Sequence, residues 1–478
     1  MRSGLPIGVA LLAAACAPRQ YTAPVTEPAA LTRMDPAWFV TQEYDPLWWR
    51  QFNDPVLEDL QTRALEANHD IRIAVARVRQ ARAIFDDVQR DRYPAVTVGG
   101  SVDRREQVAP GFSDEPVDTT TYSAGFDAFW EIDLFGRVRS AVRAAAAEAA
   151  AFEATLEDVR VTVAGEVART YFELRGLQQQ LAVAERSLVN QQETLRLTRV
   201  RRDLGAGHDQ DVASAAARVA ATEAELPAIR SAIAEREHRL AVLIGVRPGE
   251  LKADLAPRDY PPLAKALPLG DPSTLLRRRP DVRAAERRLA AASAREGIAA
   301  ADLFPRITVS GFLGFIAGRG SDFGTSDSRA WAVTPALSWA GFDLGSARAR
   351  LRGAEAAVTE AAAAYEQTVL RALEETENAL AAYAAQQQRL VKLIDQARES
   401  ARAANIARTR YREGVADFLE LLDAERTQLQ AEDAVAQAEA GVFVGVVSVY
   451  KALGGLSSVD GVDAGSTPRP AGPPGAGG

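Results

Sequence analysis

One sequence pattern occurs twice in this chain of 478 residues. Residues 94–139 hold two stretches of alternating apolar and polar residues, a polar loop between them, and then Asp133-Leu134-Phe135-Gly136. Residues 305–348 repeat the pattern and end on Phe342-Asp343-Leu344-Gly345. The copies lie about 210 residues apart, whereas solenoid repeats span roughly 20–50 residues. We therefore predict a duplicated half-protein in which each half joins two strands to long helices.

The alternating stretches predict four strands of the type that crosses a membrane. Their period of two gives each strand one apolar face and one small or polar face. Each is about 9–11 residues long, enough to cross a bilayer when tilted. Two hairpins packed on a soluble core are the alternative, but a small, polar second face suits a wet lumen better. The expected strands are 96–104, 121–131, 306–316 and 330–340.

Long helical patterns fill most of the remaining chain. One helix is expected from Asp54 to about Arg92, ahead of Pro94. The pattern after Arg137 continues to Gly205, and leucines recur in it at seven-residue spacing, which indicates coiled-coil packing. Each long helix is expected to turn back at a glycine-containing break and form a helical hairpin. The tip glycines are Gly205, Gly207 and Gly414.

The N-terminus resembles a secretory signal, with Arg2, an apolar run and small residues. The only cysteine, Cys16, stands where a bacterial lipoprotein is cleaved and acylated, although Ala13 replaces the usual leucine. An ordinary signal with an incidental cysteine is the alternative. The expected division is a signal peptide (1–15), an acylated tether (16–53), a first repeat (54–245), a connector (246–272), a second repeat (273–455) and a disordered tail (456–478).

Composition excludes several classes of function. The chain is 47% apolar and 25% charged, and after the N-terminus it has no apolar run long enough for a transmembrane helix. Its formal charge of -8 argues against a nucleic-acid partner. The three histidines are scattered, and no phosphate loop or nucleophile motif occurs. We expect no enzyme activity, no metal and no cofactor other than a lipid on Cys16, so a partner must supply energy.

Four such strands cannot stand alone in lipid, because every backbone N–H and C=O there needs a partner and the sheet must close. Two chains would give eight strands and three would give twelve, and strand physics leaves both possible. The small residues of the inward face favour an open lumen, and hence three chains.

Several motifs together resemble the TolC-like outer-membrane efflux channels, and most closely the lipoprotein outer-membrane factors of tripartite multidrug pumps. They span nearly all of residues 48–455, and their order and spacing are more specific than any one alone. The motifs are residues 48–55 (WWRQFNDP), 130–136 (WEIDLFG), 276–286 (LRRRPDVRAAE), 303–307 (LFPRI), 411–414 (YREG) and 421–424 (LLDA).

The resemblance implies a mixed α and β membrane protein. Three chains would share a twelve-strand β-barrel in the outer membrane of a Gram-negative bacterium, with coiled-coil helices forming a periplasmic α-barrel. The implied partners are a periplasmic adaptor and an inner-membrane transporter of the RND type. The implied function is passive export of drugs or other small solutes. A protein-secretion duct and a non-conducting periplasmic scaffold are the alternatives.

The resemblance also implies a constriction at the periplasmic tips of the inner helices. Three copies of Glu420 and Asp423 would form an acidic ring that attracts cations. Leu419 would narrow the passage, Tyr411 lies on the approach, and Arg426 is expected to pair with an acidic neighbour and hold the tip shut. The alternative is that these are ordinary solvated positions beside a helix turn.

Overall fold

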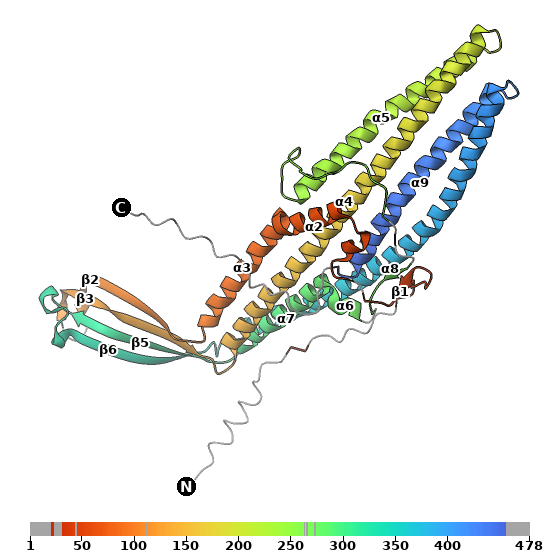
Figure 1. The fold of residues 1–478 in the computed structure, drawn as a ribbon. Helices are drawn as coiled ribbons and strands as arrows, with labels where there is room; N and C mark the ends of the chain where they lie inside the picture. The colour runs from red at the N-terminus through yellow and green to blue at the C-terminus, as the bar shows by residue number, and fades with distance from the viewer. Residues whose placement is uncertain are drawn as a thin grey trace. The chain divides into compact units, whose positions relative to one another are not determined.

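The computed structural model describes residues 21–22, 31–43, 45–109, 113–261, 263, 266–271 and 274–455. The predicted signal peptide, Cys16 and the predicted tail lie outside these residues. The described parts of Met1–Glu27, Ile73–Leu156 and Asp281–Leu370 form one compact unit, here called the sheet unit. Those of Pro28–Arg72, Glu157–Pro280 and Arg371–Gly478 form the second, the hairpin unit (Figure 1).

The described elements follow one another in duplicated order. They are β1 (Phe39–Val40), η1 (Trp48–Phe52), α2 (Pro55–Ala67), α3 (His69–Arg90), β2 (Ala95–Ala109), β3 (Ser113–Ile132), α4 (Arg137–Asp203), α5 (Asp209–Leu243), β4 (Leu267–Pro268), α6 (Leu275–Arg278), α7 (Pro280–Ala301), β5 (Arg306–Ala317), η3 (Gly320–Asp322), η4 (Ser326–Ser328), β6 (Arg329–Ser338), α8 (Leu344–Arg412) and α9 (Phe418–Ala452).

The sheet unit contains an antiparallel sheet in the order β2-β3-β5-β6, so strands of the two repeats pair through β3 and β5. β5 and β6, of 12 and 10 residues, lie close to their predicted ranges. β2 and β3 are longer than predicted, with 15 and 20 residues. Most of the extra residues, 105–109 and 113–120, are charged or polar, and they continue the antiparallel ladder to Ala109 and Ser113. Arg104 and Asp118 also form an ion pair across the two strands.

The register places the alternating residues as the sequence predicts. Val98, Phe126, Leu313 and Trp331 stand opposite one another across all four strands, so they share one face. Each of these four side chains is more than half exposed in the single chain. The other face carries mainly small and polar residues, among them Ser101 and Ser123, whose hydroxyls hydrogen bond at 2.8 Å. One face of the sheet is therefore apolar and open, and the other is largely hydrophilic.

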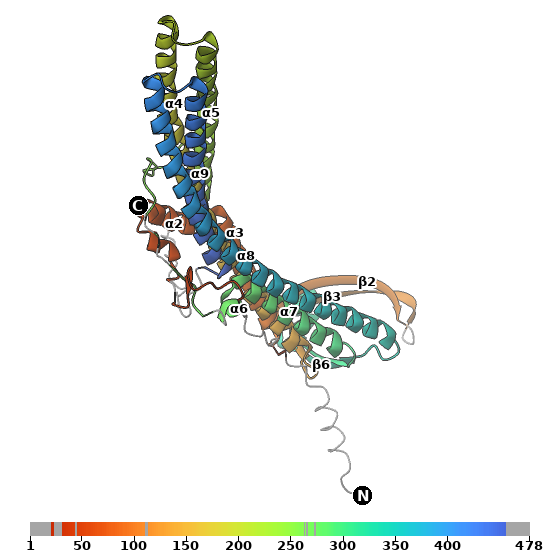
Figure 2. The same cartoon turned by 90° about the vertical axis from the view of Figure 1, so that its right-hand side faces the viewer.

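The hairpin unit contains two helical hairpins, formed by α4 from Glu157 onward with α5 and by α8 from Arg371 onward with α9. The two hairpins lie side by side (Figure 2). The return helices α5 and α9 each have 35 residues. An aromatic core packs at the base of this unit: Trp48 stacks on Tyr450 at 5.5 Å between ring centroids, and Phe172 lies 4.8 Å from Phe52 and from Phe443. The WWRQFNDP motif thus supplies core residues.

The helix predicted from Asp54 to about Arg92 is wrong in one respect, because it breaks at Asn68. Asn68 has an extended ψ of 134°, which ends α2. Its side-chain oxygen accepts from the N–H of Asp70, and its amide donates to the Leu243 carbonyl at 2.9 Å. Asn68 therefore caps α3 and joins it to the end of α5.

Among the described residues, α9 alone is long and apolar enough to cross a membrane by length and composition. The sequence predicts no transmembrane helix after the N-terminus, because it has no run of about 18 consecutive apolar residues there. Its apolar positions Val442, Val446, Val447 and Val449 are each at most 2% exposed. These positions pack in the core of the hairpin unit, as in the core helix of a folded domain.

Gly125 and Gly314 face each other on β3 and β5, and the sheet is close-packed at this pair. A Cβ at Gly125 would lie 2.7 Å from the Leu313 carbonyl oxygen and 2.8 Å from the Phe312 ring. We predict that Gly125→Leu destabilises the sheet by about 1–3 kcal/mol through overpacking. The change should lower the yield of folded, heat-modifiable protein on gels. Gly311→Ala, whose Cβ would have its nearest neighbour at 3.6 Å, is the control and should fold normally.

Candidate functional site at the hairpin tips

Both hairpins turn by the same backbone motif. Gly205 and Gly414 have φ of 75° and 80°, the left-handed region that glycine adopts without a Cβ penalty. In each turn the next residue closes a bond to the helix end: Ala206 donates to the Arg201 carbonyl at 2.8 Å, and Val415 to the Arg410 carbonyl at 2.9 Å. These are Schellman ends. Gly207 has an ordinary φ, but its Cβ would come within 3.2 Å of the Arg202 nitrogen.

The return helices begin differently in the two repeats. The Asp417 side chain accepts from the Glu420 N–H at 2.8 Å and caps α9. At the equivalent place His208 donates its own N–H to Asp211 at 3.3 Å. Side-chain oxygens of aspartate are strong helix caps, so α9 has the better-fixed start.

A small apolar core joins the two hairpins just behind their turns. Its buried members come from all four helices: Leu195, Ala215, Val219, Ala407, Tyr411, Phe418 and Leu421. The Tyr411 and Phe418 rings meet edge-on at 6.0 Å between centroids. The bulky second-repeat residues thus fill space against the smaller residues of the first repeat.

Tyr411 is the main polar contact between the hairpins. It is 3% exposed, and its hydroxyl lies 3.2 Å from the Thr198 hydroxyl on α4. Arg201 covers the Tyr411 ring at 4.5 Å and also donates to the Tyr411 backbone carbonyl at 2.6 Å. This cation supplies a partner to a carbonyl at the C-terminal end of α8, where helix carbonyls lack one.

A second polar contact is a buried ion pair. The Arg408 Nε donates to Glu425 at 2.9 Å, and these side chains are only 18% and 5% exposed. Thr194 of the first hairpin donates to the same carboxylate oxygen at 3.1 Å, and Arg408 also donates to Gln428. The Glu425 carboxylate therefore links α4, α8 and α9.

The other predicted tip residues form an exposed stripe on α9. Leu419 is 65% exposed, and the Asp423 and Arg426 side chains are 68% and 54% exposed. Glu420 pairs with Arg410, and Arg426 pairs with Asp423 in its own helix. Within one chain, Arg426 thus pairs inside its own helix. The polar contacts described above join Thr198 and Arg201 to Tyr411, and Thr194 to Glu425.

The sequence analysis missed Arg408, Glu425, Thr194 and Arg201. A signal for Glu425 was present: Phe418, Leu421 and Glu425 follow the helical spacing of a buried stripe, so a carboxylate stands where an apolar residue is expected. The cationic partners give no such signal. Within the part of the chain that the structure describes, no three His, Cys, Asp or Glu side chains cluster as metal ligands.

The architecture is that of a duplicated membrane-sheet protein. Each repeat contributes two strands to an antiparallel sheet with an exposed apolar face, and each continues into a long helical hairpin. The model of the family described as outer membrane efflux protein matches residues 60–246 and 272–455. The chain belongs to this family. It is an outer-membrane protein and the outer-membrane channel of a tripartite efflux system, as the sequence predicted.

Individual proteins agree with this assignment. The pyoverdine export outer membrane protein OpmQ of Pseudomonas putida is 34% identical over 86% of this chain and 88% of its own length. The outer membrane protein OprJ of Pseudomonas aeruginosa is 32% identical over 86% of each. The solved structure of the outer-membrane channel OprN superposes with a TM-score of 0.90 and 49% identity, covering 92% of this chain and 99% of that one. The role of the family is transport rather than catalysis.

The buried pair makes a specific prediction about stability. Glu425→Ala removes the acceptor of Arg408 and Thr194, and losing hydrogen bonds to a charged group costs about 1.5–3 kcal/mol. Arg410→Ala breaks the exposed pair with Glu420 and should cost at most about 1 kcal/mol. Denaturant unfolding of the purified protein, followed by circular dichroism, measures both.

An apolar replacement of both partners is the further control. Because no charge is then left buried, Arg408→Met with Glu425→Leu should recover most of the loss. If Glu425→Ala and Arg410→Ala lower the free energy of unfolding equally, the contacts of Glu425 with Arg408 and Thr194 contribute no more than an exposed ion pair.

Proposed function

We propose that three copies of this chain form a continuous duct with a twelve-strand barrel. In one chain the sheet ends at β2 and β6, and the backbone groups of these edges need partners in lipid. Pairing β6 of one copy with β2 of the next supplies them. The small residues on the hydrophilic face, including Gly99, Ser101 and Gly125, favour the wider barrel of three copies over the filled interior of an eight-strand barrel.

The duct conducts small solutes passively and works with a periplasmic adaptor and an inner-membrane RND-type transporter. The observation that carries this proposal is the duplicated sheet and hairpin plan of an outer-membrane channel. Relatives of this chain include a pyoverdine export protein, a solvent efflux pump protein and an antibiotic efflux pump protein. They support a small-molecule cargo over a protein one.

The passage is gated at the tip of the second hairpin. The exposed stripe of Leu419, Glu420, Asp423 and Arg426 is free to narrow the duct when three copies meet. Tyr411 and Glu425 act behind it, since they attach the second hairpin to the first. Opening moves the α8–α9 tip and separates Tyr411 from Thr198 and Arg201.

Removing the carboxylates of the stripe tests this gate. Glu420→Ala with Asp423→Ala leaves the charges of Arg410 and Arg426 unbalanced, so the ratio of potassium to chloride permeability should fall. Single-channel recording in a planar bilayer measures the ratio. Asp203→Ala with Asp209→Ala removes two carboxylates at the other hairpin tip and should leave it unchanged. An equal change in both variants, or none in the first, would reject the stripe as the gate.

A lipid on Cys16 anchors the N-terminus in the membrane. The support is the sequence alone: an apolar run and small residues end at this cysteine. Mass spectrometry of the mature protein should find a chain that begins at Cys16 and carries acyl groups. Cys16→Ala should abolish the acyl mass, and an unmodified N-terminus on the native chain would reject the anchor.

A further inference from the structure

Two adjoining cavities lie in the hairpin unit away from the tips. One has a volume of about 480 Å³ and is lined by α4, α8, α9 and the connector; the other has about 460 Å³ and includes the N-terminal segment. Both are lined by Glu439 of α9. We call the combined space the Glu439 groove. Cavities of about 300–1,000 Å³ are of the size that binds small organic molecules.

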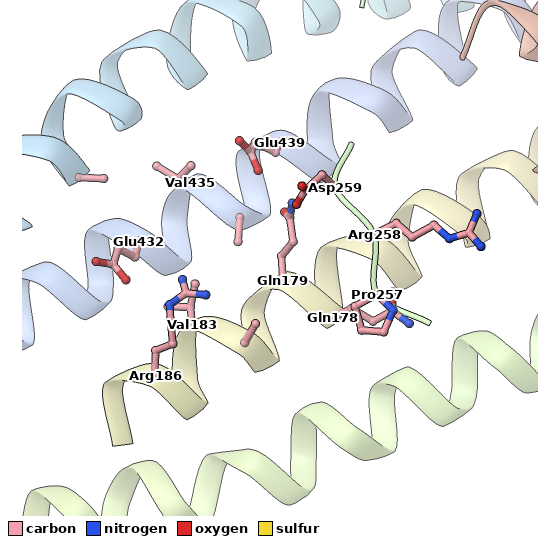
Figure 3. A pocket seen from close by; sticks show the side chains of 13 residues that line it. Gln178, Gln179, Val183, Arg186, Pro257, Arg258, Asp259, Glu432, Val435 and Glu439 are labelled. Carbon is pink, nitrogen blue, oxygen red and sulfur yellow. The ribbon is translucent and has the colours of Figure 1, made fainter. Parts of the chain in front are cut away.

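The first side of the groove is polar around Glu439. In Figure 3, Gln179 and Asp259 lie at the same end of the cavity as Glu439, whereas Arg186 and Glu432 lie at the other end. Burial, with the nearby Asp259, raises the pKa of Glu439, and a hydrogen bond from Gln179 opposes this rise. The Gln179 side-chain oxygen is buried and has no hydrogen-bond partner among the described residues. This end is therefore rich in acceptors and short of donors.

The second side of the groove is aromatic and apolar. It is lined by Trp38, Tyr260 and Phe443, with Leu390 and Val442. Tyr260 stacks on Phe443 at 4.5 Å between ring centroids, and its hydroxyl is held by the Phe172 carbonyl. The aromatic side is thus fixed in place. Glu439 lines both sides of the groove, so its carboxylate lies where the polar and aromatic sides meet.

We propose that the Glu439 groove binds an amphipathic organic ammonium ion. Its N–H donors meet the Glu439 carboxylate and the unpartnered Gln179 oxygen, with the Asp259 charge nearby. Its apolar body lies against the side of the groove that Trp38, Tyr260 and Phe443 line. A partly buried carboxylate next to another acid is costly without a cation, and this ligand supplies one.

Other occupants fit the groove less well. A metal ion needs more ligands than Glu439 and Asp259 provide, and no three candidate ligands cluster in the described parts of the chain. A second copy of the chain could cover the aromatic side, but it would have to bring a cation to Glu439. This binding site is independent of the proposed duct and gate, because it requires neither conduction nor opening.

The test uses the full-length protein in phosphatidylcholine nanodiscs, with empty nanodiscs as the blank. The probe is 4-phenylbutylamine, and its matched controls are the neutral 4-phenylbutanol and the anionic 4-phenylbutyrate. Isothermal titration should show saturable binding of the amine and at least about tenfold weaker binding of both controls, a difference that corresponds to about 1.4 kcal/mol.

Two variants locate the site. Glu439→Gln should weaken amine binding at least about tenfold, which again corresponds to about 1.4 kcal/mol of binding free energy. Glu432→Gln removes a carboxylate at the other end of the same cavity, where Gln428 already donates to it at 2.7 Å, and should leave the affinity unchanged. Native thermal stability without ligand shows that both variants are folded.

Three results would overturn the proposal. Equal affinity for the amine and the alcohol would mean that the groove is only an apolar surface. Unchanged amine affinity in Glu439→Gln would place the binding elsewhere. Absence of saturable binding to the native protein would mean that the assembled protein leaves no open site, as when a second copy fills it.

Discussion

The unpaired edges of the four-stranded sheet determine most of what this chain can be. Lipid offers no hydrogen bonds to a backbone, so β2 and β6 require partners before the apolar face can enter a membrane. The chain order β2-β3-β5-β6 already pairs the two repeats in the middle, and the remaining edges belong to different repeats. In the proposed assembly, pairing of β6 with β2 of the next copy would therefore resemble the contact between repeats that β3 and β5 make inside one chain.

The alternation of residues predicts the sheet well because strand geometry is local. A period of two assigns each residue to a face, and the structure then sets the register that places Val98 opposite Phe126. The extension of β2 and β3 could not be predicted, because its many charged residues are typical of a loop. The ion pair between Arg104 and Asp118 joins two separate segments, so no local pattern indicates it. The break at Asn68 is a tertiary effect, because its amide reaches the distant Leu243.

At the hairpin tips, the turns could likewise be predicted from local sequence, whereas the contacts between the hairpins could not. The turns at Gly205 and Gly414 depend on left-handed backbone at one position, which a glycine in the sequence reveals. The contacts that join the hairpins depend on residues some 200 positions apart, such as Thr198 with Tyr411 and Thr194 with Glu425. No periodicity within one helix carries that information, so the sequence suggests gate candidates on α9 but not the buried contacts behind them.

The contact from Arg201 to the Tyr411 main chain has a consequence for sequence variation. A backbone carbonyl is present whatever side chain occupies position 411, so this hydrogen bond survives any replacement of the tyrosine that keeps the helix. Phenylalanine at position 411 loses only the hydroxyl contact, and a residue without a ring loses the hydroxyl and ring contacts together. Variation at position 411 is therefore graded in its effect, whereas replacing Arg201 removes the backbone and ring contacts together, so the arginine is the less replaceable partner.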